Sequence, residues 1–258
     1  MEKFKMVKMI MHGCNGAMGR TITELVAAQK DILIVAGVDK NLEFKQDYPV
    51  YNSLEEVKEE ADVIVDFASA TAVDHLLDYC VKKKRPVVLC TTGLSKEQVE
   101  KVSETAKETA VLRSANMSLG INLLLKLVKE AAKTLAVSDF DIEIVEKHHN
   151  QKLDAPSGTA LALADSINEA LNNEYHYEYD RSKRHEKRDE KEIGISAVRG
   201  GSIVGEHDVI FAGKDEVVTF SHTAYSKAIF GKGAIEAAKF LAGKPAGLYN
   251  MSDVIDNH

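Results

Sequence analysis

The sequence predicts an α/β protein in which a domain with a parallel sheet carries a second, α+β domain with a mixed or antiparallel sheet. Three observations predict this fold class. Strand-like and helix-like runs alternate through the first half of the chain, which is typical of parallel strands joined by helical crossovers. A glycine-rich turn lies between the first strand pattern and the first helix pattern. In the second half, consecutive strand patterns follow one another with short links.

Composition limits the classes of protein that fit. The 258 residues allow one large domain or two small ones, and 45% apolar with 28% charged residues is ordinary for a soluble globular protein. The net charge of -7 argues against a general nucleic-acid binder. The three cysteines are far apart and predict neither a zinc site nor a disulfide framework. With no apolar signal core and no run of the roughly 18 to 20 apolar residues that span a bilayer, we expect a cytoplasmic protein.

The first elements in order are a strand over Val7 to Met11, a glycine turn and a helix. Gly13, Gly16 and Gly19 give the turn the spacing G-x-x-G-x-x-G. Glycines let the backbone turn tightly and approach a pyrophosphate at the N-terminus of the helix. Strand, turn and helix together predict a Rossmann-like dinucleotide-binding domain.

A second buried strand, Ile32 to Val38, ends at Asp39, twenty positions after Gly19. An acid at this point accepts hydrogen bonds from the adenosine ribose hydroxyls. An ordinary loop aspartate is the alternative, and the preceding glycine turn makes it the weaker one. Lys40 follows and offers a charge to the 2′-phosphate of NADPH, so we expect NADH and NADPH both to be used.

The alternation continues with predicted strands over residues 61–67, 86–90 and 110–113 and helices over 71–83 and 95–108. In such sheets ligands bind beyond the carboxyl ends of the strands. Small polar segments follow three strands there, although such loops are also common in structural roles. These segments are Phe67-Ala68-Ser69, Cys90-Thr91-Thr92-Gly93 and Ser114-Ala115-Asn116-Met117. Cys90 itself is interpreted as a small buried apolar residue.

The loop between a strand over Asp141 to Val145 and a helix after Ser157 holds two histidines, a lysine and an aspartate. Ser157 is a candidate N-cap, and the helix start from Ser157 to Thr159 offers amides to a carboxylate or phosphate. Lys152 can pair with that anion or deliver a proton. His148 and His149 would point to opposite faces of a straight strand. A capped helix with solvated charges is the alternative for each residue taken alone.

The remaining elements complete two predicted domains, residues 1–119 with 229–258 and residues 120–228. A helix over 121–135 marks the crossing between them. The charged stretch 172–192 is interpreted as a solvated mobile loop, with a cationic lid for an anionic substrate as the alternative. Further strands are predicted over 193–198, 206–212 and 217–222, and a last helix over 231–241.

The run from Glu146 to Ala160, EKHHNQKLDAPSGTA, resembles the signature of the 4-hydroxy-tetrahydrodipicolinate reductases, also called dihydrodipicolinate reductases. The resemblance extends from Val7 to about Val254. It implies NAD(P)H-dependent reduction of the dehydrated form of 4-hydroxy-tetrahydrodipicolinate, a small dicarboxylate, in the diaminopimelate route to lysine. It also implies a homotetramer and a reaction that requires no metal.

The same resemblance assigns roles to residues. It makes His148 the general acid or electrophilic partner and Lys152 the donor of a proton to the nitrogen side. His149, Ser157, Gly158 and Thr159 are expected to bind substrate carboxylate. The expected cofactor-binding residues are Gly13, Cys14, Asn15, Gly16, Ala17, Met18, Asp39, Lys40, Cys90, Thr91, Thr92, Ser114, Ala115, Asn116 and Met117. Cys90 departs from the glycine that is common in the family, so its side chain can crowd the cofactor.

Two other classes of protein remain as alternatives. Another Rossmann-type reductase, such as an amino-acid dehydrogenase, would share the nucleotide fold. A non-catalytic nucleotide-sensing regulator would lack the His148 and Lys152 pair and would usually carry a basic segment that binds nucleic acid.

Overall fold

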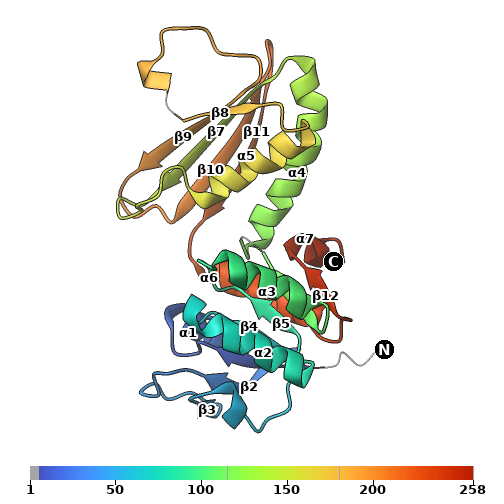
Figure 1. The fold of residues 1–258 in the computed structure, drawn as a ribbon. Helices are drawn as coiled ribbons and strands as arrows, with labels where there is room; N and C mark the ends of the chain where they lie inside the picture. The colour runs from blue at the N-terminus through green and yellow to red at the C-terminus, as the bar shows by residue number, and fades with distance from the viewer. Residues whose placement is uncertain (1–5, 115, 180, 258) are drawn as a thin grey trace. The chain divides into compact units, whose positions relative to one another are not determined.

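The computed structural model describes residues 6–114, 116–179 and 181–257 (Figure 1). The chain forms two compact units. The first unit comprises Met1–Leu119 and Ala228–His258, and the second comprises Gly120–Lys227. No helix within the described ranges is long and apolar enough to cross a membrane.

The first unit is built on a seven-stranded sheet in the order β12-β6-β5-β4-β1-β2-β3, in which all the pairs are parallel. Apart from the added edge strand β12, this is the strand order of a dinucleotide-binding fold. The predicted Rossmann-like sheet is therefore confirmed. The strands are β1 (Val7–His12), β2 (Ile32–Val38), β3 (Val50–Tyr51), β4 (Val63–Asp66), β5 (Val87–Leu89), β6 (Ala110–Arg113) and β12 (Gly247–Tyr249).

Helices cover both faces of this sheet (Figure 1). The core on one face includes Ile22 of α1 and Ile235 of α6, while the other includes Leu76 of α2 and Val102 of α3. The helices of this unit are α1 (Ala17–Ala27), α2 (Val73–Lys83), α3 (Lys96–Ala106), α6 (Ala228–Leu241) and α7 (Met251–Ile255), with 3-10 turns η1 (Leu54–Glu56) and η2 (Ala70–Ala72). Both faces are thus buried, which explains the nearly continuous apolar strands.

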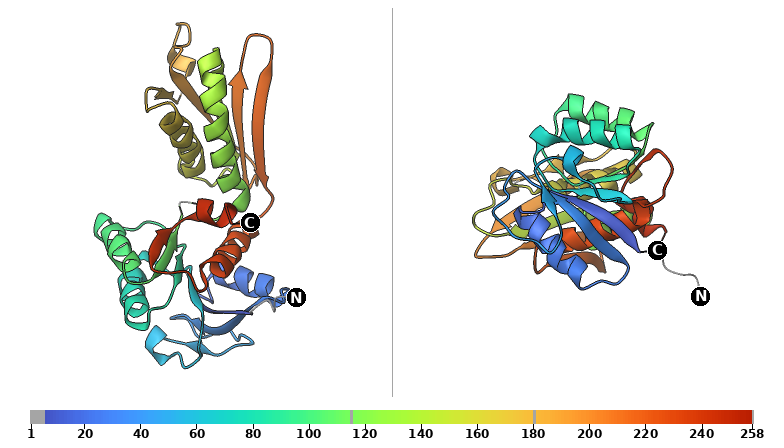
Figure 2. Two further views of the ribbon diagram at one scale, coloured as in Figure 1. Left: turned by 90° about the vertical axis from the view of Figure 1, so that its right-hand side faces the viewer. Right: turned by 90° about the horizontal axis from the view of Figure 1, so that it is seen from below.

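The second unit is built on a mixed sheet in the order β11-β10-β7-β9-β8. β7 runs parallel to β9 and antiparallel to β10, so the expectation of a mixed or antiparallel sheet is confirmed. Its strands are β7 (Asp141–His148), β8 (His176–Glu178), β9 (Glu192–Arg199), β10 (Gly205–Ala212) and β11 (Val217–Ala224). Helices α4 (Leu119–Leu135) and α5 (Gly158–Ala170) lie on the same face of this sheet (Figure 2). Two further 3-10 turns are η3 (Ala136–Ser138) and η4 (Arg181–Lys183).

The alternation of β7 decides which of its side chains face the helices. Ile142 and Ile144 are fully buried in the core beneath α4 and α5, and Glu146 and His148 follow them in phase. The strand runs to His148, three residues past its predicted end. His148 therefore stands on a rigid element, whereas His149 begins the loop.

The charged stretch 172–192 is not simply a solvated loop, so that expectation was wrong in part. It contains β8, and Arg181 pairs with the buried Glu192. Arg188 donates to the carbonyl oxygens of Ile142 at 2.7 Å and Glu192 at 2.6 Å, and to Glu143 at 3.1 Å. Acidic residues and carbonyls of β7 and β9 thus fix these two arginines, and the partners on β7 are distant in sequence.

Candidate active site

The glycine turn after β1 has a backbone that only glycine fits at two positions. Gly13 has a φ of +81°, and a Cβ there would lie 2.7 Å from the carbonyl oxygen of Phe67. A Cβ on Gly19 would lie 2.2 Å from the carbonyl oxygen of Gly13. Gly16 is the N-cap of α1 and provides no side-chain cap, so the first amides of the helix, including those of Ala17 and Met18, are left for a ligand.

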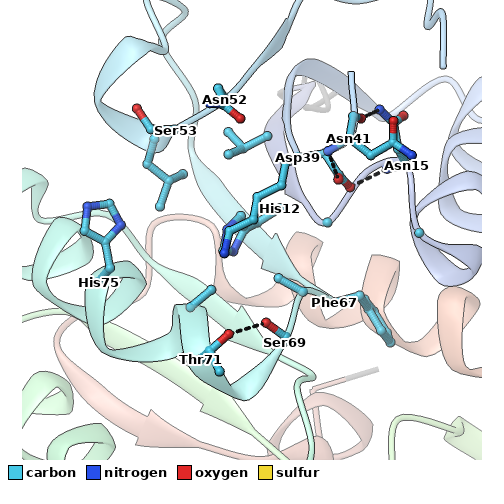
Figure 3. Close-up of a pocket in the computed structure, with 17 residues that line it drawn as sticks. His12, Asn15, Asp39, Asn41, Asn52, Ser53, Phe67, Ser69, Thr71 and His75 are labelled. Carbon is cyan, nitrogen blue, oxygen red and sulfur yellow. Dashed lines mark hydrogen bonds between the residues drawn. The ribbon is translucent and has the colours of Figure 1, made fainter. Parts of the chain in front are cut away.

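A cavity of about 630 Å³ opens beside this turn (Figure 3). Of the residues expected to bind a cofactor, it is lined by Gly13, Asn15, Gly16, Asp39 and Lys40. It is also lined by polar residues that were given no cofactor-binding role, which lie at the end of β1, after β2, β3 and β4, and at the start of α2. These are His12, Asn41, Asn52, Ser53, Ser69, Thr71 and His75.

The carboxylate of Asp39 is fixed at the mouth of the glycine turn. The backbone amides of Asn15 and Asn41 each donate to one of its oxygens at 2.9 Å. The side chain of Asn15 in turn donates to the carbonyl oxygen of Asn41 at 2.5 Å. Because each carboxylate oxygen can accept a second bond, Asp39 retains capacity for ribose hydroxyls.

The side chain of Cys14 is a core residue and does not line the cavity. It is fully buried, and burial together with the charge of Asp39 raises the pKa of its thiol to about 12. Its amide lies 3.5 Å from the carbonyl oxygen of Val38, to which the amide of Gly13 donates at 2.8 Å. Any contact of Cys14 with a cofactor is therefore left to other main-chain atoms.

A buried aspartate organises the segments after β4 and β5. Asp66 is fully buried, and one oxygen lies 2.7 Å from Nδ1 of His12 while the other accepts from the hydroxyl of Thr91 at 2.6 Å. Burial, reinforced by Asp66, raises the pKa of the Cys90 thiol well above its usual value. Thr91 and Cys90 are thus engaged with the protein, whereas Thr92 is exposed.

The segment after β6 contains the remaining expected cofactor residues. Ala115 lies outside the described residues. Ser114 is half-buried, Asn116 accepts from the amide of Ser118 at 2.8 Å, and Met117 is only 5% exposed. Met117 belongs to the core, so its side chain anchors the segment.

In the second unit, His148 is held by a buried carboxylate. Its Nδ1 lies 2.5 Å from Oε2 of Glu146, which is itself fully buried. Burial alone would raise the pKa of Glu146, but hydrogen bonds from Arg199, His148 and the Ser157 amide outweigh it and lower that pKa. Arg199 donates to both carboxylate oxygens, at 2.8 and 2.7 Å.

Ser157 supports this arrangement from inside the protein, and its expected contact with substrate remains a prediction. It is 2% exposed, and its amide donates to Glu146 at 3.0 Å. Its hydroxyl accepts from the amide of Ala160 at 3.2 Å, which confirms the predicted N-cap, and lies 3.0 Å from Nε2 of His207. Gly158 is exposed, and a Cβ there would meet nothing within 4 Å.

The loop between β7 and α5 is held by a short turn. The amide of Lys152 donates to the carbonyl oxygen of His149 at 3.2 Å, and that of Asn150 donates to Gly201 at 3.2 Å. The ammonium of Lys152 lies 2.8 Å from Asp154, and this hydrogen bond lowers the pKa of Asp154. His149 is half-buried, and Thr159 is half-buried in the first turn of α5.

Three residues of this site were missed by sequence reasoning, namely Glu146, Arg199 and His207. His207 is 4% exposed, and its ring meets that of His148 edge to face with centroids 5.2 Å apart. Burial, and secondarily His148, lowers the pKa of His207 to about 4. The signal for Glu146 was available, because the alternation of Ile142 and Ile144 places it on the buried face.

A glycine turn with an acid after the second strand, together with histidine, lysine and a helix N-terminus on one loop, defines an oxidoreductase that uses a nicotinamide dinucleotide. Comparison with known families agrees. Residues 7–117 match the model for the N-terminus of dihydrodipicolinate reductase, and residues 120–255 match the model for its C-terminus. The chain belongs to the dihydrodipicolinate reductase family.

Similar proteins are found among both curated sequences and solved structures. A 4-hydroxy-tetrahydrodipicolinate reductase of Caldanaerobacter subterraneus subsp. tengcongensis is 56% identical over 250 residues, covering 97% of this chain and 98% of that protein. One of Clostridium tetani is 49% identical and covers both chains completely. The dipicolinate-bound dihydrodipicolinate reductase of Paenisporosarcina sp. TG-14 has the same fold, with a TM-score of 0.80 at 24% identity, covering 95% of this chain and 97% of that one.

Proposed function

We propose that this chain reduces the dehydrated form of 4-hydroxy-tetrahydrodipicolinate with NADH or NADPH, in the diaminopimelate route to lysine. The observation that supports it most is the segment from His148 to Thr159, which carries two histidines, a lysine and a helix N-terminus between the end of β7 and the first turn of α5. Relatives that match the whole chain are named 4-hydroxy-tetrahydrodipicolinate reductase.

The first unit fits a dinucleotide at the glycine turn. Gly13 and Gly19 keep the backbone close enough for a pyrophosphate to reach the amides at the start of α1. Asp39 is fixed where ribose hydroxyls would bind. A bound nicotinamide supplies the hydride, while the protein supplies binding and orientation. In this proposal residues 1–119 and 229–258 form the dinucleotide-binding domain.

Residues 120–228 form the substrate-binding and oligomerisation domain. His148 is the general acid or electrophilic partner, and Lys152 delivers a proton to the nitrogen side of the substrate. His149 and the Gly158 and Thr159 amides bind carboxylate at the positive end of the α5 dipole. Lys152 pairs with Asp154, and because its ammonium has three donors it can keep this partner while it donates to the substrate.

The same structure supports use of both cofactors. Asp39 is half-buried and favours NADH through the ribose hydroxyls, while its charge repels a 2′-phosphate. Lys40 is exposed and lines the cavity, and an exposed ion pair is worth about 0.2–1 kcal/mol. The two effects nearly cancel, so kcat/KM for NADH and NADPH should agree within roughly tenfold.

Steady-state kinetics with the Lys40→Ala variant test this balance. We expect it to weaken NADPH selectively, and more so at low salt, because screening is then less. Lys45→Ala is the matched control, since Lys45 is also exposed and lies outside the cavity. A preference of more than about a hundredfold for either cofactor, or equal loss with both, would contradict the cancellation.

We also propose a cytoplasmic homotetramer assembled through the sheet of the second unit. The face opposite α4 and α5 carries Lys147, whose ammonium lies 3.1 Å from Glu206 and 3.3 Å from Asp208. Light scattering after size-exclusion chromatography measures the mass directly. A monomer at micromolar concentration would contradict the tetramer without affecting the proposed reaction.

The reaction itself is tested by following cofactor oxidation in the near ultraviolet, with substrate generated in situ by the preceding synthase. We expect absorbance to fall only when the synthase, its substrates, the cofactor and this protein are all present. Oxidation that is independent of the synthase would point to another reductase. No oxidation with freshly generated substrate, from a protein that binds NADH, would refute the proposal.

A further inference from the structure

Glu146 is a buried carboxylate for which the proposed reaction has no use. The alternation of β7 places it on the same face as Ile142, Ile144 and His148. Its exposure is 0%, and a buried charge is unfavourable unless it is paired and hydrogen-bonded. Glu146 lies two residues before His148 on the same face of the strand, so the hydrogen bonds of its carboxylate determine how His148 is protonated.

Both oxygens of this carboxylate accept two hydrogen bonds. Oε1 accepts from the amide of Ser157 at 3.0 Å and from Arg199 at 2.7 Å. Oε2 accepts from Arg199 at 2.8 Å and lies 2.5 Å from Nδ1 of His148. A carboxylate has about four lone-pair sites, so the acceptor capacity of Glu146 is filled.

This geometry decides which nitrogen of His148 carries the proton. Arg199 is always charged, and its two bonds to the carboxylate require an ionised Glu146, which accepts hydrogen bonds and cannot donate them. Nδ1 of His148 must therefore be the donor in the short contact with Oε2. The neutral ring then has an unprotonated Nε2.

The surroundings of Nε2 differ from those of Nδ1. Nε2 lies over the backbone of Gly205, where an added Cβ would come within 3.1 Å of it. The absence of a side chain at this position leaves room beside this nitrogen. Nδ1 is thus hydrogen-bonded to Glu146, whereas Nε2 has space beside it for a substrate atom.

We propose that Glu146, held by Arg199, is a positioning residue that keeps a proton on Nδ1 of His148 in both the neutral and the charged ring, so that Nε2 is the nitrogen that takes up a proton and, from the imidazolium, donates it to the substrate. This inference rests on the proposed function, because it assumes that His148 acts on the substrate. Arg199 also donates to the carbonyl oxygen of Asp154 at 2.6 Å. The same guanidinium therefore ties the loop of Lys152 to the carboxylate that orients His148.

The variant Glu146→Gln tests the tautomer. Oε1 is reached by two donors that cannot become acceptors, Arg199 and the Ser157 amide, whereas Oε2 is reached by one such donor, Arg199, and by His148, whose Nδ1 can also accept. The amide oxygen is therefore favoured at the Oε1 position, and the NH₂ group falls beside Nδ1 of His148 at the expense of one bond from Arg199. That group donates, so Nδ1 must lose its proton and Nε2 must carry it. We expect nitrogen-15 NMR to show this exchange of tautomers, and kcat to fall by roughly 10²-fold with KM changed less than about twofold.

The pH profile is the readout that a merely structural role would not move. The charged and titratable groups around His148 are Glu146 on its own strand, Arg199 on β9, Lys152 on the loop, His207 on β10 and His222 on β11. Removing the negative charge at residue 146 disfavours the imidazolium. The alkaline limb of the kcat profile should therefore move to lower pH.

Glu143→Gln is the matched control, because Glu143 lies on the same strand, faces the other side of the sheet and pairs with Arg188. It should leave the His148 tautomer and kcat unchanged. If Glu146→Gln fails to fold, the wild-type NMR spectrum still decides, since an Nε2-protonated neutral His148 would overturn the inference. Gly205→Ala adds a second test: it should retain the Nδ1 proton and lower kcat by crowding Nε2, and unchanged kcat would count against Nε2 as the substrate-facing nitrogen.

Failure of this inference is distinguishable from failure of the proposed function. A wild-type protein without turnover would refute the function, while the tautomer remains measurable. Normal wild-type turnover together with an unaltered kcat and pH profile in Glu146→Gln would refute only the role of Glu146.

Discussion

Two glycines of the turn after β1, Gly13 and Gly16, should respond differently to the same added methyl group. Gly13→Ala forces a φ of +81° on a residue with a Cβ and brings that Cβ within 2.7 Å of the Phe67 carbonyl oxygen. Left-handed strain costs about 1–2 kcal/mol, and overpacking against backbone about 1–3 kcal/mol. We therefore expect a loss of about 2–5 kcal/mol of stability.

Gly16→Ala is the matched comparison. Gly16 has an ordinary φ of -67°, and its added Cβ would approach only the Gly13 carbonyl oxygen, at 3.3 Å. Its cost in stability should be about 1 kcal/mol or less, because glycine is only moderately better than alanine as an N-cap. Because Gly16 lines the cavity, the added methyl group should instead weaken NADH binding.

Urea unfolding followed by circular dichroism measures the stability, and fluorescence titration measures NADH affinity. The expected result is an unstable Gly13→Ala and a stable Gly16→Ala that binds NADH poorly. A Gly13→Ala protein as stable as wild type would refute the reading of the turn. So would equal destabilisation by the two substitutions.

Three further predictions concern the second unit. Lys152→Ala should retain NADH affinity and lose about 10²–10⁴-fold in kcat, as expected for a lost general acid; near-normal kcat would show that the role is misassigned. Gly158→Val should raise the substrate KM without unfolding the protein, since an added Cβ meets nothing within 4 Å, and an unchanged KM in a folded variant would remove the anion site. His207 stays neutral in the folded state because its pKa is lowered from 6.5 to about 4, whereas the unfolded chain takes up a proton as pH falls through 6.5. Stability should therefore drop by about 3 kcal/mol between pH 6.5 and 4, and His207→Gln should flatten this slope in urea unfolding; an equally steep slope in the variant would contradict it.

The sequence predicted the parts of the fold that depend on local pattern. The alternation of apolar runs, the glycine spacing and the cap at Ser157 each require only neighbouring residues. The edge strands β3 and β12 were not predicted, because two or three residues are too few to show the alternation of a strand. Their place in the sheet depends on partners far away in the chain.

The site divides in the same way. The loop from His148 to Thr159 could be identified as a contiguous run of sequence, but the buried residues that hydrogen-bond to it could not. Glu146 meets Arg199 across 53 positions, and Ser157 meets His207 across 50. The partners of the Ser157 side chain therefore could not be identified from the sequence. Ion pairs with Asp141 and Glu143, which lie far away in the sequence, likewise fix Arg188 in a stretch whose composition is typical of a solvated loop.

The late return of the chain to the first unit has a consequence for biosynthesis. Residues of α6 and α7, including Ile235 and Met251, complete one core of that unit, and β12 pairs with β6. The ribosome makes these residues only after it has made the whole of Gly120–Lys227. The contiguous second unit can thus mature while the nucleotide fold still exposes an apolar face and an unpaired strand edge. A nascent chain arrested anywhere before Ala228 would present that unprotected surface to chaperones and proteases, however well its catalytic loop had formed.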